Sequence, residues 1–303
     1  MVKFDISIAF DNANYIIPQV NLYINSLKQM IPNDSTLHIV TTKENETGDF
    51  KSFIYQNIKN ANIYTPGNQF IELKSRCKYL LNAIDVEPTK DWLMRTDLDF
   101  IWLNKLDKID GLLNDCDIVI QPENRRIFKE DIYEERIWRQ IYKAIEIKPP
   151  TEKIQFVEDG EWGLPLYNTG FFIIRSDLIP ILKDRWEILT KICEKWIEFN
   201  IHPNETAFTA IIQDERWKVK QLPTWANFNP ISKFRKGNFP SQELKENSLI
   251  PEDVVGLHYH KPNWLAHLMK YNKKVKDIVE GMEYKIPSDW WNLPMEIYQE
   301  KNI

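Results

Sequence analysis

The segment from residue 91 to residue 103 constrains the fold of this chain more than any other. Residues 92–94 are apolar and predict a short buried strand. Asp97 and Asp99 follow, and apolar residues resume at 100–103. Carboxylates placed between buried apolar runs are costly unless another group compensates their charge. We therefore expect a binding partner for these two acids.

A divalent cation is one such partner. In an extended segment, residues two apart lie on the same face, so Asp97 and Asp99 would point to one place. Hard cations accept carboxylate oxygens, and a bound cation can in turn hold a diphosphate. The alternative is a solvated turn, because acid-x-acid triplets are common in acidic chains. Asp115 and Asp117 form such a triplet where a strand begins, whereas ligands of open α/β sheets bind at the carboxyl ends of strands, the position of Asp97 and Asp99.

The rest of the chain predicts an α/β fold. Apolar periodicity and turn signals predict strands at 4–10, 37–40, 61–64, 118–120 and 166–174, and helices at 16–30, 50–58, 73–84, 178–199 and 207–213. Asn204 or Thr206 is the expected cap of the last helix. The first strand, helix and strand imply a right-handed crossover and a parallel pair. The loop at 11–15 would then lie at the same sheet edge as Asp97.

The chain is expected to contain a core and a C-terminal part. Its 303 residues and 43% hydrophobic content suffice for one large α/β unit or two small ones. We assign residues 1–215 to the core. The charged segment at about 124–150 would be a helical insertion, serving as a lid or acceptor-side wall or forming only a solvated helix pair. Helical periodicity weakens after Arg216, so residues 216–303 form the C-terminal part.

Charge and cysteine usage exclude some classes of protein. The net charge of −5 argues against binding to nucleic acid. Three widely spaced cysteines fit buried thiols in a reducing compartment, and no apolar run approaches the roughly 20 residues of a membrane helix. We therefore expect a cytoplasmic protein. The basic tail at 267–276, followed by Trp290 and Trp291, predicts either peripheral contact with an anionic membrane or a helix docked on the core.

Several motifs occur in an order typical of one family. They are the strand end at 9–11, Asp97 with Asp99, and the segments 167–171, 204–206 and 258–262. With them the chain resembles the GT-A glycosyltransferases, most closely the retaining family-8 enzymes that use nucleotide sugars. The resemblance implies a three-layer αβα sandwich with a mostly parallel central sheet and a small C-terminal extension, the extension completing the acceptor side and the metal site.

The resemblance also assigns the cation and diphosphate site. It implies that Asp97 and Asp99 bind Mn²⁺ (or Mg²⁺) and the donor phosphate or ribose, and that His258 is the third protein ligand. Lys261 would contact the diphosphate as a point charge. The structural alternatives are a histidine that only packs and an ordinary surface lysine.

Further residues match positions that hold the nucleotide and the donor sugar in relatives. The resemblance implies that the uridine contacts Ala9, Asp11 and Asn14, where the alternative is a plain turn. One cation of the 73–84 helix would face the donor, and helical spacing does not rank Lys74, Arg76 and Lys78.

Two more residues would act on the sugars. Asn168 would contact the donor or acceptor sugar, or would be a turn residue before a strand. Glu205 would be the base of an inverting enzyme or the nucleophile of a retaining one, or an acid that favours a helix start. Two departures concern this region: Asn204-Glu205 stands where the family pattern has Asp-Gln, and the spacer after His258 is shortened, with His260 inside it.

The resulting hypothesis is a metal-dependent hexosyltransferase that moves a hexose from a UDP-sugar to a glycan or lipid-linked acceptor with retention. The alternatives are an inverting enzyme and a non-catalytic carbohydrate-binding protein. A phosphatase would need its acidic pair after the first strand, which ends at the single Asp11. A nucleotidyltransferase would need a glycine-rich loop, and the chain has 9 glycines and no such loop.

Overall fold

The computed structural model describes residues 4–10, 16–32, 34–41, 49–64, 83–123, 131–156, 160–199, 201–230, 250–260 and 262–292. A seven-stranded sheet is central, with strand order β10-β6-β9-β4-β1-β2-β3. Its strands are β1 (Phe4–Ala9), β2 (Thr36–Val40), β3 (Ala61–Tyr64), β4 (Trp92–Thr96), β6 (Ile118–Pro122), β9 (Tyr167–Arg175) and β10 (Val219–Gln221). Only β9 runs antiparallel to its neighbours β4 and β6. The mostly parallel α/β sheet expected from the sequence is confirmed.

Both faces of the sheet are buried, and the alternation of strand side chains divides them between two cores. Ile118 and Ile120 belong to one core and Val119 to the other. Phe172 and Phe171 divide in the same way. Successive strand residues point to opposite faces, so strands covered on both sides are apolar throughout. This explains the continuous apolar runs in the sequence.

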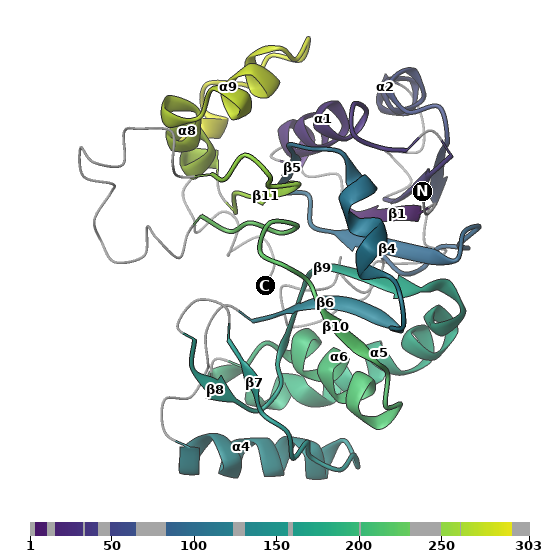
Figure 1. Cartoon of the computed structure of the whole chain (residues 1–303), viewed down its shortest axis with the longest axis vertical. Coiled ribbons are helices and arrows are strands. Elements are labelled where there is room, and N and C mark those ends of the chain that lie inside the picture. Colours follow the sequence, from purple (N-terminus) through teal and green to yellow (C-terminus); the bar gives the residue numbers. More distant parts are fainter. Residues whose placement is uncertain are drawn as a thin grey trace.

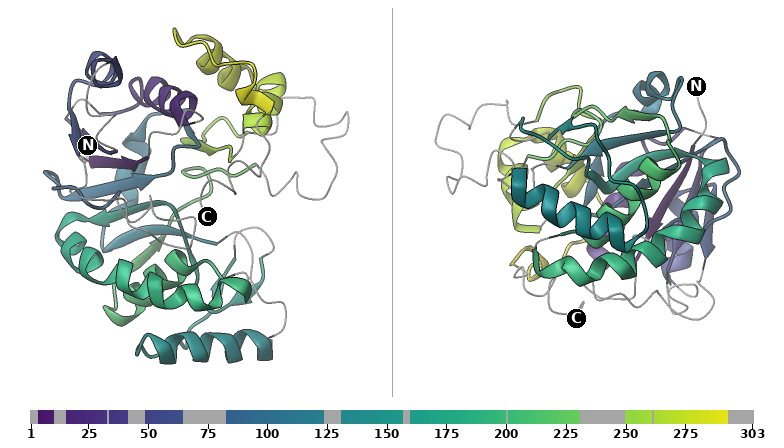
Figure 2. Two further views of the ribbon diagram at one scale, coloured as in Figure 1. Left: turned by 180° about the vertical axis from the view of Figure 1, so that it is seen from behind. Right: turned by 90° about the horizontal axis from the view of Figure 1, so that it is seen from below.

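Helices cover the two faces in separate layers (Figures 1 and 2). One layer holds α1 (Ile16–Leu27), α2 (Asp49–Asn57) and the 3₁₀ helix Leu106–Leu112. The other holds α5 (Ile179–Cys193) and α6 (Pro203–Asp214), which pack on each other. The segment between β6 and β9 contributes α4 (Asp131–Ala144) and the short pair β7 (Ile154–Gln155) and β8 (Trp162–Gly163). Ile137, Trp138 and Ile141 of α4 are buried in the α5–α6 core, so this helix is not a solvated excursion.

The C-terminal part forms a third core beside the sheet. Strand β11 (Gly256–His258) pairs antiparallel with β5 (Phe100–Trp102), and α8 (Pro262–Tyr271) and α9 (Lys273–Glu280) pack nearby (Figure 1). Trp290, in the 3₁₀ helix Trp290–Asn292, is 2% exposed in this core. The basic tail is therefore docked as helices on the core, and contact with a membrane stays a prediction. Among the described residues, no helix is both long and apolar enough to cross a bilayer.

Some boundaries differ from those predicted. Helix α6 begins at Pro203, with His202 as its N-cap and no side-chain capping bond, so the capping role expected for Asn204 or Thr206 is wrong. Proline suits the first helical position because its missing N–H has no partner there anyway. Helix α5 ends at Cys193 and continues as the 3₁₀ helix Glu194–Phe199. Most of the helix expected at 73–84 lies outside the described residues.

Candidate active site

The two acids that follow β4 lie on a bend, not on an extended strand. The backbone N–H of Asp97 donates to the Gly170 carbonyl at 2.8 Å, and the Asp99 carbonyl accepts from Tyr259 N–H at 3.0 Å. Asp97 is thereby fixed to β9, and Asp99 to the residue after β11. The expectation of an extended segment was wrong, but the bend still keeps both carboxylates close to one histidine.

That histidine is His258, the last residue of β11. The register of the β5–β11 pair places His258 opposite Phe100. Phe100 is the residue that follows Asp99, so His258 lies close to that acid. His258 Nε2 lies 3.1 Å from Asp99 Oδ1 and 3.8 Å from Asp97 Oδ2. The side chain is 6% exposed. The structure thus brings together the three residues proposed as metal ligands, although His258 is 159 residues from Asp99.

The charges of this group are strongly coupled. Burial by itself would raise the pKa of Asp99, but the imidazoles of His258 and His260 hold that pKa below its usual range. Burial opposes the charge of His258 too, yet the carboxylates of Asp99 and Asp97 leave its pKa raised. The two carboxylates therefore favour positive charge at this place.

Arg95 is a further member of the site that the sequence analysis missed. It lies in β4 with a side chain 4% exposed, and its Nη2 donates to Asp97 Oδ1 at 2.6 Å. Its Nη1 donates to the Thr169 carbonyl. Burial raises the pKa of Asp97 above its usual range, and Arg95 opposes this rise. The sequence offered one signal: an arginine directly after the apolar run 92–94 and two residues before the first acid.

Gly170 leaves the space in which these side chains meet. A Cβ at this position would lie 2.7 Å from Asp97 Oδ2, 2.8 Å from Asn168 Oδ1 and 3.3 Å from His258 Cε1. The first two distances are shorter than a carbon–oxygen contact allows. A larger residue here would have to displace the Asp97 and Asn168 side chains, so close approach, and not a turn, explains the glycine in the 167–171 segment.

A second polar group lies beside the first. The Asn168 amide donates to Glu123 Oε1 at 2.6 Å, and Asn168 Oδ1 accepts from Gly170 N–H at 2.9 Å. The pairing of β6 with β9 shifts register between Ile120 and Gln121, so Gln121 faces Asn168 and Glu123 follows just beyond the strand end. Such irregularities are frequent next to active sites.

Glu205 completes the second group from the first turn of α6. It is 7% exposed and lies beside the Glu123 carboxyl, and its Oε2 has no hydrogen-bond partner and lies 3.9 Å from His202 Nδ1. Burial, then the neighbouring charge of Glu123, raise the pKa of Glu205 well above its usual range. The preceding Asn204 donates its amide to Thr169 Oγ1 at 2.8 Å, and Trp186 Nε1 donates to the Asn204 carbonyl at 2.8 Å. These bonds fix the start of α6 against β9.

Glu123 was also missed by the sequence analysis, although a signal existed. Strands β4 and β6 both run antiparallel to β9, so their carboxyl ends lie at the same edge of the sheet. The rule that selected Asp97 from the end of β4 selects Glu123 from the end of β6.

The other predicted contacts are only partly described. Ala9 is half-buried at the end of β1, which runs parallel to β4 with Ser7 opposite Arg95, so Ala9 lies at the same sheet edge as Asp97. The remaining positions lie outside the described residues: Asp11, Asn14, Lys74, Arg76, Lys78 and Lys261.

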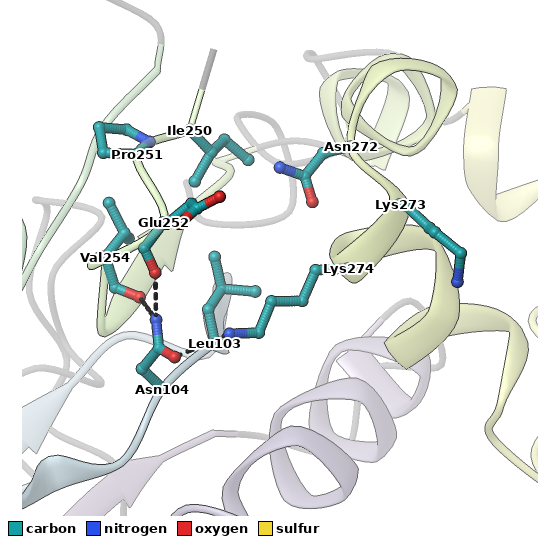
Figure 3. A pocket seen from close by; sticks show the side chains of 9 residues that line it. All are labelled: Leu103, Asn104, Ile250, Pro251, Glu252, Val254, Asn272, Lys273 and Lys274. Atoms are coloured by element: carbon teal, nitrogen blue, oxygen red, sulfur yellow. Dashed lines mark hydrogen bonds between the residues drawn. The ribbon is translucent and has the colours of Figure 1, made fainter. Parts of the chain in front are cut away.

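A cavity in the C-terminal part is separate from this site. It has a volume of about 530 Å³ and lies between the ends of β5 and α9 (Figure 3). Lys274 reaches across it and donates to Asn104 Oδ1 at 2.8 Å. Because Leu103 and Val254 line it, the cavity is at the far end of the β5–β11 pair from His258.

Comparison with known proteins identifies the fold. No family model and no curated protein matches the sequence, but solved structures have a similar fold. The galactosyltransferase LgtC, in complex with donor and acceptor sugar analogues, matches with a TM-score of 0.55 and 12% identity over 96% of this chain and 99% of that one. An active-site mutant of LgtC with glutamate in place of glutamine matches with a TM-score of 0.52 and 14% identity over 95% and 98%. The glycosyltransferase GlyE of Streptococcus pneumoniae TIGR4 gives 0.54 and 15% over 99% and 64%.

These likenesses establish architecture, because identities this low do not carry an activity from one protein to another. The chain has the GT-A glycosyltransferase fold, with the likeness to family 8 that its motifs predicted. What its site does must be argued from the residues of the site.

Proposed function

We propose that this protein is a glycosyltransferase that moves a hexose from a UDP-sugar to a glycan or lipid-linked acceptor, with retention, and that it depends on a divalent cation held by Asp97, Asp99 and His258. The convergence of two carboxylates and a buried imidazole at the carboxyl edge of a GT-A sheet carries this proposal. The likeness to LgtC, a galactosyltransferase, and to GlyE, a glycosyltransferase, supports glycosyl transfer as the reaction class.

The ligand chemistry fits a divalent cation. Asp99, His258 and His260 offer ligand atoms that all lie within 4.8 Å of one another. When bound, such a cation neutralises the charge that develops on a leaving diphosphate. The protein's part is to hold the ligands: β9 fixes Asp97 through the Gly170 carbonyl, and β11 delivers the imidazole.

The second polar group is proposed to bind the reacting sugars. Burial and the neighbouring charge of Glu123 raise the pKa of Glu205 well above its usual range, and on this basis we take Glu205 to be protonated. The Asn168 amide donates to the Glu123 carboxylate. Glu205 then donates a hydrogen bond to a sugar oxygen, as an amide would, and does not serve as base or nucleophile. This favours the retaining route assisted by the leaving phosphate over the inverting alternative.

Donor hydrolysis tests the proposal without a known acceptor. Purified protein is incubated with UDP-sugars and Mn²⁺, and free UDP is measured. Asp97→Asn and Asp99→Asn should each abolish turnover with the circular dichroism spectrum unchanged. Asp115→Asn removes a charge from the other acid-x-acid triplet and should retain wild-type activity. Full activity in either site variant, or in a chelator, would contradict the proposal.

A non-catalytic carbohydrate-binding protein is the second candidate. The Asn204-Glu205 corner, which departs from the family pattern, is the observation that favours it. If the protein turned over none of the UDP- and GDP-sugars tested but bound a glycan, this second candidate would be supported instead.

A further inference from the structure

His260 extends the group formed by the acids and His258. It lies two residues after His258, beyond the end of β11. The two imidazoles are stacked, with ring centroids 3.8 Å apart and planes 17° from parallel. One ligand atom from each of Asp99, His258 and His260 lies within 4.8 Å of the other two. Three ligand atoms at about 2.1 Å from one cation are at most about 3.6 Å apart, so shifts of about 1.2 Å are needed to close the set. Because a ring nitrogen binds a cation in the plane of its ring, one of the two stacked rings must also turn.

The backbone at His260 is unusual for a side chain of this kind. Its φ is 57°, in the left-handed region that glycine enters without steric cost. The shortened spacer thus sets a histidine where glycine would be less strained. Strained positions of this kind are concentrated at ligand-binding sites. The strain agrees with a role for the imidazole but does not identify it; the cluster of ligand atoms does.

We propose that His260 is a ligand of the cation, so that two imidazoles and the Asp99 carboxylate form the inner part of the site and make it select transition-metal cations such as Mn²⁺ and Co²⁺ over Mg²⁺. This inference deepens the proposed function and rests on its cation site.

The selectivity follows from the chemistry of the ligands. Imidazole nitrogens suit first-row transition metals, whereas Mg²⁺ prefers oxygen ligands in an octahedral arrangement. Arg95 holds Asp97 Oδ1 at 2.6 Å, and Asp97 Oδ2 lies 3.8 Å from His258 Nε2, on the side of the cation site. With His260 the site would offer two imidazole nitrogens beside the two carboxylates, and this mixed set favours a transition metal over Mg²⁺.

Cation binding by the nucleotide-free protein tests the proposal. Isothermal titration with MnCl₂, CoCl₂ and MgCl₂ gives the affinities, and the visible spectrum of the Co²⁺ form reports on its ligands. His260→Gly removes the imidazole at a left-handed position without adding strain, and His260→Asn keeps a polar side chain there. Arg216→Gly is the matched control, because Arg216 is exposed with φ 55° and lies outside the site.

The proposal expects Mn²⁺ and Co²⁺ to bind the wild type at least tenfold more tightly than Mg²⁺. Both His260 variants should lose about 10- to 100-fold in Mn²⁺ affinity and show a changed Co²⁺ spectrum, and Arg216→Gly should match the wild type. If the variants bind Mn²⁺ as the wild type does, the inference is overturned while the proposed function stands. If neither the wild type nor the variants bind any of the cations, the inference fails together with the cation site of the proposed function.

Discussion

Replacing Gly170 by alanine tests the close approach on which the site depends. The new Cβ would lie 2.7 Å from Asp97 Oδ2 and 2.8 Å from Asn168 Oδ1, about 0.5 Å inside an ordinary contact. Both oxygens belong to side chains that could turn away. Each is held, however: the Asp97 carboxylate by Arg95 at 2.6 Å, and Asn168 Oδ1 by the Gly170 N–H at 2.9 Å.

The cost of Gly170→Ala can be worked from these bonds. Weakening the neutral hydrogen bond of Asn168 costs about 1 kcal/mol, and weakening the charged one of Asp97 about 2 kcal/mol. Alanine lowers the conformational entropy of the unfolded chain, and this offsets about 0.4–1 kcal/mol of the loss in stability. The net loss in the free energy of unfolding is about 2 kcal/mol, which leaves a typical domain folded. Turning Asp97 away should also weaken Mn²⁺ binding by about tenfold.

Urea unfolding and calorimetric Mn²⁺ titration measure the two effects. Gly111→Ala is the control, because Gly111 is exposed in the Leu106–Leu112 helix and a Cβ there meets nothing within 4 Å. The control should be unchanged or more stable by up to about 1 kcal/mol. The reasoning is refuted if Gly170→Ala is as stable as Gly111→Ala and binds Mn²⁺ like the wild type.

Two further predictions concern the buried charges. Because the folded-state pKa of Glu205 is raised, this carboxyl favours folding fully below its unfolded pKa of about 4.3 and loses that contribution as the pH rises through the folded value. Glu205→Gln should therefore gain stability relative to the wild type in urea unfolding as the pH rises above about 4.5, and it should keep donor turnover. A difference that does not change with pH, or a loss of turnover, would contradict a protonated Glu205. Arg95→Met removes the guanidinium that pairs with Asp97, whose side chain is 31% exposed, and should lower the unfolding free energy by about 2 kcal/mol in urea unfolding. A loss under about 1 kcal/mol would show that solvent already screens this pair.

The sequence by itself determined the layers of the fold and one edge of the site. Alternation of apolar side chains in strands is a local property with period two, so strands such as Ile118–Pro122 could be recognised without knowing their partners. The position of Asp97 and Asp99 at the end of a strand selected the edge of the sheet. His258 could be predicted as a ligand only from the order of the family motifs, because the residues around it in the sequence do not mark it as one.

The tertiary structure decided which groups meet and in which charge state. Pairing of β11 with β5 brings His258 to Asp99, which is 159 positions away in the sequence, and the register shift between β6 and β9 brings Glu123 to Asn168. Pairings over such separations depend on which edges remain open after the sheet has formed, and no local pattern encodes that choice. The raised pKa of Glu205 likewise arises from its burial beside another acid, which exists only in the folded chain.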